Sequence, residues 1–464
     1  MGRSKDFAFA ICTNLLSTLA SAFITLLLPK SIPVENNGYF QLFLFYAGYV
    51  GLLHVGWPDG FYLVKCGAEY SSLDRRQVWG QLKSFIFFQL ILSVIISAGS
   101  LLLVPDADKK VIFFFVGIMT IISNLRIFLL YILQATARIR DYSIATIVGL
   151  VAYILLVSIF MLLKITDYVP YIIANIASVF LPLLWGLYYN RDLLFKGPVS
   201  LKESFGDTKM YVGAGFKLLI ANVASSFIIG VMRWAIEYQW DVSVFGKISI
   251  TITISNMFMT LINAIALVLL PMLRRMNQDK IKPLYKHLNI VLLTSIFVGM
   301  ILYYPVQFVL VRWLPDYADS LIYMALLLPI CVFESKNALI LNTYLKALRK
   351  ENMIMLINVG TVALSAVLSC VSVFFLKNIT LSMGFVVVAL AFRCVISEVY
   401  LSRTMGVKVG SSIVMELLLS VLFVVFNWGV GGPLGLVLYC LVIAGYVLIN
   451  NRKIKESYQL LLKG

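Results

Sequence analysis

Charged residues are scarce in this chain, and histidine is almost absent. Only 13% of the residues are charged, and the chain has two histidines, His54 and His287. They stand in isolated contexts, and the sequence shows no metal-ligand spacing, glycine-rich phosphate loop or ATPase domain. The six cysteines lie in or beside apolar runs, so we interpret them as small core residues. We therefore expect no metal, no cofactor and no enzymatic activity.

Hydrophobic residues are abundant, at 61% of the chain, and they gather in long uncharged runs. A run of about 22–26 residues is long enough to cross a ~30 Å hydrocarbon core as a helix. Because lipid offers no hydrogen bonds to the backbone, each run is expected to be helical. The composition predicts an all-α integral membrane protein and leaves no room for a soluble domain.

The runs predict about fourteen transmembrane helices. The count at the C-terminal end depends on residues 427–433, which contain three glycines and a proline and are typical of a turn. Without this turn, the uncharged residues 417–451 would form one helix of about 52 Å, which is too long for one crossing. The predicted spans are 7–29, 38–57, 84–104, 111–134, 142–163, 168–189, 216–236, 246–271, 288–311, 320–345, 353–376, 380–402, 412–427 and 434–450.

Basic residues alternate between the gaps that separate these spans. Of the 38 Lys and Arg residues, 27 fall in the gaps or at the span ends on one side, 7 do so on the other side, and 4 lie well within spans. Because Lys and Arg accumulate in cytoplasmic loops, this bias predicts that both termini are cytoplasmic. The net charge of +16 is explained by these loops, and we expect no nucleic-acid partner.

The two halves of the chain resemble each other at an offset of 208–211 residues. Gly38 and Gly246 each open a span, and Pro105-Asp106 and Pro315-Asp316 each precede one. Six spans in each half make the repeat parallel, an organisation found in transporters that work by alternating access around a central cleft. We therefore predict two six-helix bundles in parallel repeat plus a C-terminal helix pair.

This repeat predicts four segments. Residues 1–190 form an N-terminal six-helix bundle, and residues 191–215 form a cytoplasmic linker. Residues 216–402 form a second six-helix bundle, and residues 403–464 form the additional helix pair with a basic cytoplasmic tail.

Four basic residues lie well inside predicted spans, away from the span ends: Arg233, Arg126, Lys336 and Arg393. An ionisable side chain within the membrane costs about 2.5–3.5 kcal/mol or more near its centre. A cluster of cations in a cleft would bind an anionic head group, and the planar guanidinium of Arg suits phosphate. The alternative is that each residue forms a structural ion pair or extends to the membrane interface.

Five further ionisable residues are candidates for ion or proton coupling. These are Glu237, Glu334, Glu398, Asp59 and His54. Glu237 follows Arg233 by one helical turn and can share its face. Glu334 lies two residues from Lys336, so the two side chains cannot face each other along one helix. Structural ion pairing, and a packed histidine at position 54, are the alternatives.

Three segments resemble the Wzx-like polysaccharide flippases of the multidrug/oligosaccharidyl-lipid/polysaccharide exporter superfamily. Residues 131–142 (YILQATARIRDY) are similar to that family's loop after the fourth span, and residues 241–246 (DVSVFG) to the turn that opens its eighth span. Residues 227–234 resemble its seventh span, which often ends in an Asp-Arg pair. Met232 replaces the Asp and Arg233 keeps the Arg, which puts an acidic coupling role at that position in doubt.

The resemblance implies a protein that flips undecaprenyl-pyrophosphate-linked oligosaccharides across the bacterial cytoplasmic membrane for O-antigen, capsule or another polysaccharide. Its implied partners are the lipid-linked oligosaccharide, membrane lipids and a polysaccharide polymerase. Three alternatives remain open: a cation-coupled multidrug exporter, a peptidoglycan-precursor flippase, and a membrane scaffold that transports nothing.

Overall fold

The computed structural model describes residues 2–194, 201–255 and 278–463, and these ranges contain helices and no β-strand. Within them, eleven helices are long and apolar enough to cross a membrane, and a bent pair, Val34–His54 with Trp57–Lys65, makes a twelfth crossing if it counts as one span. Shorter apolar helices, Ala20–Ser31 and Val242–Ser255, lie in the predicted spans 7–29 and 246–271. Residues 256–271 of the latter span lie outside the described ranges. The multi-pass helical fold is confirmed, and fourteen is an approximate count.

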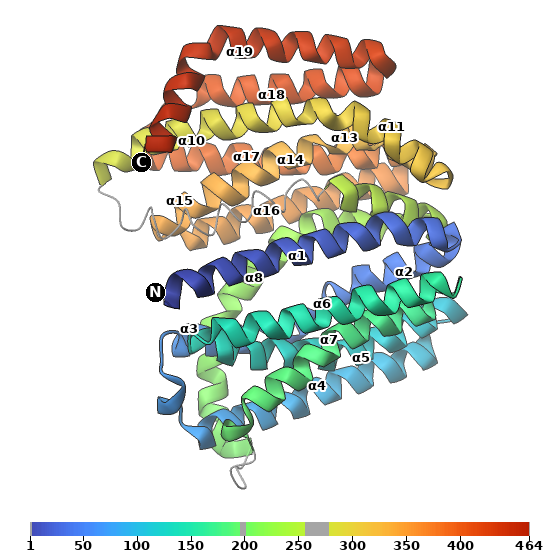
Figure 1. Cartoon of the computed structure of the whole chain (residues 1–464), viewed down its shortest axis with the longest axis vertical. Coiled ribbons are helices and arrows are strands. Elements are labelled where there is room, and N and C mark those ends of the chain that lie inside the picture. Colours follow the sequence, from blue (N-terminus) through green and yellow to red (C-terminus); the bar gives the residue numbers. More distant parts are fainter. Residues whose placement is uncertain (1, 195–200, 256–277, 464) are drawn as a thin grey trace. The chain divides into compact units, whose positions relative to one another are not determined.

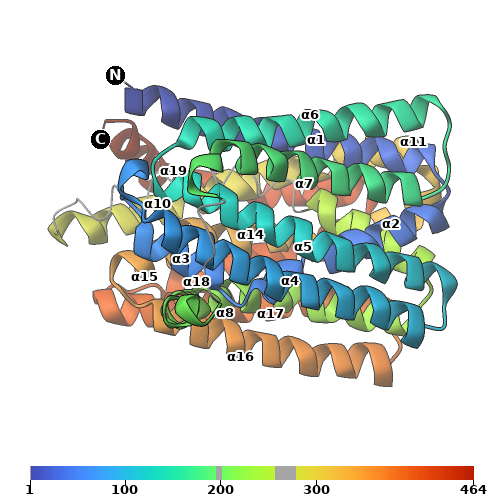
Figure 2. The same cartoon turned by 90° about the horizontal axis from the view of Figure 1, so that it is seen from below.

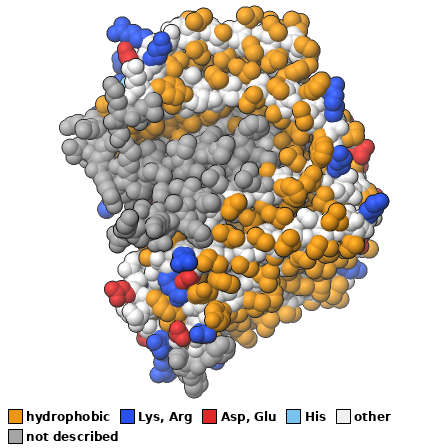
Figure 3. Space-filling view, viewed as in Figure 1, with side chains coloured by type: hydrophobic (Ala, Val, Ile, Leu, Met, Phe, Trp, Pro, Cys, Tyr) orange, Lys and Arg blue, Asp and Glu red, His pale blue; other side chains and the backbone are white. Residues whose placement is uncertain are grey.

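The surface has the character expected of helices that face lipid. Hydrophobic side chains cover most of the described surface visible in Figure 3, while Lys and Arg side chains form a few small groups. Large apolar side chains such as Leu102, Leu162 and Ile449 are exposed. A surface of this kind is stable in hydrocarbon, where apolar side chains need no cover from water.

The chain forms two compact units. One comprises residues 1–223 and 242–246, and the other comprises residues 224–241 and 247–464. Helix α8 (Leu201–Gln239) contributes to both and begins well before residue 216, where the sequence predicted a span. Within residues 191–215, predicted to be a linker, Tyr211 is fully buried and packs against Phe61. The predicted segment boundaries themselves remain a prediction.

The first unit is a bundle in which α4 packs on α5, α5 on α7, and α6 on both α7 and α1 (Figures 1 and 2). Its core is rich in aromatic side chains, among them Phe43, Phe85, Phe128 and Tyr171. Its elements are α1 (Gly2–Ser31), α2 (Val34–Ala47), η1 (Val50–His54), α3 (Trp57–Lys65), η2 (Tyr70–Ser72), α4 (Arg75–Leu103), α5 (Ala107–Ala135), α6 (Ile139–Leu162), α7 (Val169–Tyr189), η3 (Arg191–Leu193) and the first part of α8.

The second unit packs α14 and α16 against α17, and α10 against α19. Three π-helical turns, η6, η7 and η8, interrupt its helices. After α8 its elements are the helix Val242–Ser255 from residue 247 onward, α10 (Gln278–Gly299), η4 (Met300–Leu302), α11 (Tyr303–Trp313), η5 (Pro315–Tyr317), α12 (Ala318–Leu321), α13 (Met324–Leu327), α14 (Pro329–Lys336), η6 (Asn337–Leu341), α15 (Asn342–Ala347), α16 (Glu351–Ser369), η7 (Cys370–Phe375), α17 (Ile379–Met405), α18 (Gly410–Val424), η8 (Val425–Val430) and α19 (Gly432–Lys463).

The same backbone turn occurs at equivalent places in the two units, which supports the predicted repeat. Between α5 and α6, Ala137 is left-handed (φ 58°), and the Arg138 N–H donates to the Leu133 carbonyl at 2.8 Å. Between α15 and α16, Arg349 is left-handed (φ 57°), and the Lys350 N–H donates to the Leu345 carbonyl, also at 2.8 Å. A left-handed residue followed by such a hydrogen bond is a common way to end a helix.

Two glycines that the repeat placed at equivalent positions lie in contact with each other. A Cβ atom added to Gly246 would lie 2.6 Å from the Cα of Gly38, and one added to Gly38 would collide with the Val242 carbonyl. Small residues allow membrane helices to approach this closely. The contact explains why both positions are glycine, and in the structure each glycine lies inside its helix and not at its start.

Candidate functional site

The second span is broken, and polar side chains from neighbouring helices stabilise the break. The two halves meet at an angle of 58°, and Val55 (φ 55°) and Gly56 (φ 75°) are both left-handed. A broken helix within the membrane exposes carbonyls that need donors. Asn124 of α5 donates to the Val50 carbonyl at 3.1 Å, and Gln89 of α4 donates to the Leu53 carbonyl at 3.0 Å.

Asn124 also donates to the side-chain oxygen of Gln89 at 2.8 Å, so the two side chains form one network. Both are fully buried. Sequence reasoning missed them. The available signal was a single amide in the middle of each apolar run, which is costly unless the amide is hydrogen-bonded.

The break brings His54 and Asp59 together. His54 ends η1 and Asp59 lies in the first turn of α3; both are buried, with His54 Nε2 3.6 Å from Asp59 Oδ2. The Gly56 N–H donates to His54 Nδ1 at 3.0 Å, so this nitrogen is unprotonated and the ring proton lies on Nε2, facing the carboxylate. Tyr131 of α5 is a titratable neighbour of Asp59. The arrangement holds a neutral imidazole beside a carboxylate.

Arg126 lies in α5, inside a membrane-spanning helix, and its side chain is partly buried. Its Nε atom is inaccessible and has no hydrogen-bond partner. The titratable neighbours that act on it electrostatically are Tyr142 and Tyr131. Among the described residues, no Asp or Glu forms an ion pair with this guanidinium. A cation within the membrane without a protein counter-ion is a candidate binding group for an anion.

Arg233 lies in the part of α8 that belongs to the second unit. Its Nη2 donates to the hydroxyl of Ser249 at 2.9 Å, and its side chain is partly buried. Ser249 belongs to the helix Val242–Ser255, so the hydrogen bond links two neighbouring helices.

Lys336 lies at the end of α14 and is held by two carboxylates. Its Nζ lies 2.6 Å from Oε2 of Glu398 in α17, and it also donates to Oε2 of Glu416 in α18. The side chains of Lys336, Glu398 and Glu416 are 0%, 1% and 3% exposed. Tyr285 of α10 donates to the other Glu398 oxygen at 2.9 Å. In this arrangement the ammonium of Lys336 binds carboxylates of the protein. Of the two alternatives that the sequence left open for Lys336, this is the structural ion pair and not a group free to bind an anion.

Arg393 of α17 is also held by a carboxylate. It forms an ion pair with Glu334 of α14, and its Nη1 donates to the Ser225 hydroxyl of α8 at 2.9 Å. Its side chain is completely buried, whereas that of Glu334 is 20% exposed. As predicted, Glu334 and Lys336 do not face each other, and each pairs with a residue of another helix.

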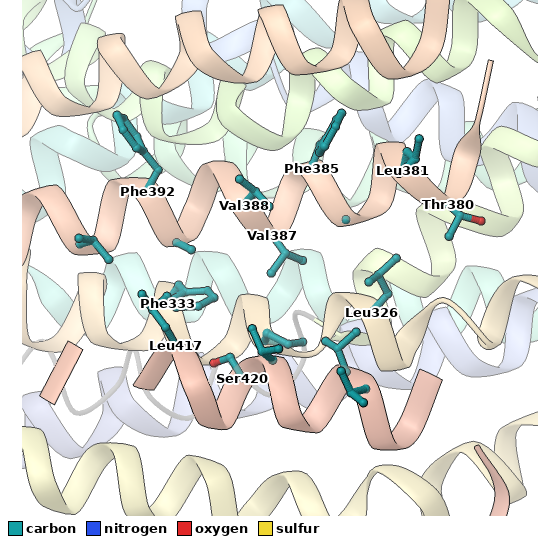
Figure 4. A pocket seen from close by; sticks show the side chains of 17 residues that line it. Leu326, Phe333, Thr380, Leu381, Phe385, Val387, Val388, Phe392, Leu417 and Ser420 are labelled. Atoms are coloured by element: carbon teal, nitrogen blue, oxygen red, sulfur yellow. The ribbon is translucent and has the colours of Figure 1, made fainter. Parts of the chain in front are cut away.

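A groove of about 670 Å³ lies on the second unit between α14, α17 and α18. Figure 4 shows Phe333 on one side of it and Phe385 and Phe392 of α17 on the other. Thr380 and Ser420 supply the only hydroxyls of the lining, and no charged residue lines it. Its chemistry suits hydrocarbon and does not suit an anionic head group.

The structure therefore joins His54 with Asp59, Lys336 with Glu398, and Arg393 with Glu334. Sequence reasoning missed Glu416, although it is the single carboxylate in the predicted span 412–427. Glu416 could have been found by the criterion that identified the four basic residues. A charged side chain within an apolar run is costly in the membrane, so it is expected to have a partner.

Comparisons with known proteins show the fold. No protein-family model and no curated protein matches the sequence. The lipid II flippase MurJ, in an inward closed conformation, is 14% identical over 97% of this chain and 99% of its own, with a TM-score of 0.65. A multidrug resistance MATE family transporter of the MOP superfamily, in an inward-facing conformation, is 12% identical over 85% of this chain and 94% of its own, with a TM-score of 0.61.

A second MATE structure, solved in complex with MaD5, is also 12% identical and has a TM-score of 0.55 over 87% of this chain and 94% of its own. At these identities the likeness shows a common fold. The chain thus has the fold of these transporters.

Proposed function

We propose that this chain flips polyprenyl-pyrophosphate-linked oligosaccharides across the bacterial cytoplasmic membrane by alternating access, for the synthesis of a surface polysaccharide such as O-antigen or capsule. The observation that supports this most is Arg126. Its guanidinium lies within a membrane-spanning helix and has no carboxylate partner among the described residues. A pyrophosphate group would supply the missing negative charge.

The chemistry of the two arginines fits such a head group. A guanidinium can donate two parallel hydrogen bonds to phosphate oxygens, and charge-assisted hydrogen bonds are about twice as strong as neutral ones. Arg126 in the first unit is the residue that we assign to this role, and Arg233 in the second unit stays a separate proposed head-group residue. Lys336 and Arg393 were candidates from the sequence, but carboxylates hold both of them in this structure.

The structural comparisons support a lipid-linked substrate. The match to the lipid II flippase extends over nearly the whole of both chains, including the C-terminal helices of this one. That protein is named for a lipid substrate, and we carry this substrate class over as part of the proposal. A polysaccharide polymerase remains a proposed partner, and cytoplasmic termini remain the proposed orientation.

Ion or proton coupling is assigned in this proposal to His54 and Asp59. The neutral imidazole directs its Nε2 toward Asp59 at the break of the second span, where a helix can change its bend. Three further groups are proposed for coupling. Glu237 of α8 lies one turn from Arg233, and Glu334 and Glu398 each form an ion pair with a basic residue.

Binding of undecaprenyl pyrophosphate to the purified protein tests the assignment of Arg126. We expect Arg126→Ala to weaken binding about 10- to 100-fold, because hydrogen bonds to charged groups contribute about 1.5–3 kcal/mol. Arg126→Lys should recover part of the affinity, since an ammonium keeps the charge but loses the paired geometry. Undecaprenol, which lacks phosphate, should bind all three proteins alike.

The matched control is Arg452→Ala, because the Arg452 side chain is 91% exposed and forms an ion pair with Glu456 one turn away. Equal affinity of wild type and Arg126→Ala for undecaprenyl pyrophosphate would contradict the assignment. Two alternatives predict different ligands: a peptidoglycan-precursor flippase prefers lipid II, and a multidrug exporter binds organic cations. Because the chain shares its fold with a MATE transporter, these cations belong among the ligands tested for binding.

A further inference from the structure

Three helices of the second unit bring their charges to one buried point. The Lys336 ammonium comes from the end of α14, the Glu398 carboxylate from α17 and the Glu416 carboxylate from α18. The side chains are at most 3% exposed. Burial of charges is costly, so these groups depend on one another for their stability.

The hydrogen bonds show how the two carboxylates are oriented. Glu398 accepts from Tyr285 through Oε1, and Glu416 accepts from the Cys394 thiol through Oε1 at 3.7 Å. Their second oxygens, both Oε2, converge on the ammonium of Lys336. The protein thus positions two carboxylate oxygens around a single monovalent cation.

Carboxyl groups outnumber the ammonium at this point. One ammonium faces two carboxyl groups, and the nearby guanidinium of Arg393 is engaged by Glu334. The position between the two Oε2 atoms is therefore one where positive charge is strongly favoured. Hard cations prefer oxygen ligands of this kind.

We propose that Lys336 acts as a tethered cation that occupies a monovalent-cation site formed by Glu398 and Glu416. While the ammonium is in place, the site has no room for a free ion, and stability of this unit does not depend on sodium or potassium. When the lysine side chain is removed, the same two oxygens bind a small free cation. The inference concerns this site alone and is independent of the transported substrate.

Thermal unfolding of the purified protein in salts of equal ionic strength tests this site. In choline chloride, whose cation is too large to enter, Lys336→Ala should unfold about 5 °C or more below wild type, because two buried carboxylates lose their partner. Methylammonium, sodium or potassium should restore most of the loss. Wild type should show the same midpoint in all four salts.

Two further variants show whether the recovery occurs at this site. Lys336→Ala combined with Glu398→Gln and Glu416→Gln has no buried charge to neutralise, so its midpoint should not depend on the cation. Lys247→Ala breaks the 2.9 Å pair with Asp319, whose side chain is 70% exposed, and should also show no cation-specific recovery.

The outcomes that overturn the proposal are distinct. One is a Lys336→Ala protein whose midpoint is equal in choline and in every small cation, and another is a wild type that loses stability without sodium. Recovery by small cations in the triple variant would place their binding elsewhere and would also overturn it.

If Lys336→Ala does not fold, the double variant Lys336→Ala with Glu416→Gln takes its place, because it leaves one buried carboxylate and not two. Its unfolding midpoint should also be higher in small cations than in choline. Failure of both variants to fold even in methylammonium counts against the proposal. Because no transport is measured, these results are independent of those that test the proposed flippase.

Discussion

Lys336 Nζ lies 2.6 Å from Glu398 Oε2, although 62 residues separate them in the chain. Glu416, 80 residues from Lys336, completes the cluster from α18. This relationship joins the C-terminal helices, which lie outside the predicted repeat, to the core of the second unit. It also shows that carboxylates hold two of the basic residues that the sequence singled out, Lys336 and Arg393.

Neutralising one carboxylate of the cluster should be tolerated, whereas neutralising both should not. Glu416→Gln leaves one ammonium facing one carboxylate, so we expect a change of about 1 kcal/mol or less in the free energy of unfolding. Glu398→Gln with Glu416→Gln leaves Lys336 buried without a counter-ion and should cost about 3–5 kcal/mol. Thermal unfolding in detergent measures both. Equal losses for the single and double variants would contradict the shared ion pair.

The polar network at the break of the second span should be essential for stability. Asn124→Leu removes the donor to the Val50 carbonyl and to Gln89, so we expect a loss of about 1–3 kcal/mol. Asn450→Leu is a suitable control, since Asn450 donates only to Tyr446 of its own helix. If the Asn124→Leu protein is as stable as the Asn450→Leu control, the break in the second span does not depend on the hydrogen bonds of Asn124.

The contact between α3 and α8 should depend on a glycine. A Cβ atom at Gly215 would collide with the backbone of Gly56 and Gly60, whereas one at Gly213 meets open space. We expect Gly215→Ala to cost about 1–3 kcal/mol. Gly213→Ala should be neutral or stabilise by up to about 1 kcal/mol, because alanine favours a helix. Similar midpoints for the two variants would contradict the close packing.

The sequence predicted the spans well because their lengths follow from the thickness of the membrane. It also predicted that Glu334 and Lys336 do not face each other along one helix. It could not identify their partners, because Arg393, Glu398 and Glu416 come from other helices, and their pairing depends on tertiary packing. The hydrogen bonds of Gln89 and Asn124 were unpredictable for the same reason, since the carbonyls that they bind become available only once the second span bends.

The orientation of the chain can be tested on a single helix. Arg140 and Lys164 are exposed and lie at opposite ends of α6, and the charge bias predicts Arg140 inside and Lys164 outside. In a protein without its native cysteines, a membrane-impermeant thiol reagent added to whole cells should label Lys164→Cys and spare Arg140→Cys. The opposite labelling would invert the topology.

Flipping of a lipid-linked oligosaccharide by the purified protein in liposomes tests the proposed function most directly. The substrate is a polyprenyl-pyrophosphate oligosaccharide whose outer-leaflet fraction is read by an enzyme that cannot cross the membrane. We predict that wild type moves this substrate between leaflets, that Arg126→Ala falls to the rate of protein-free liposomes, and that Arg452→Ala retains the wild-type rate. A wild-type protein that inserts and folds but flips no faster than empty liposomes, or an Arg126→Ala protein with the full rate, would contradict the proposal.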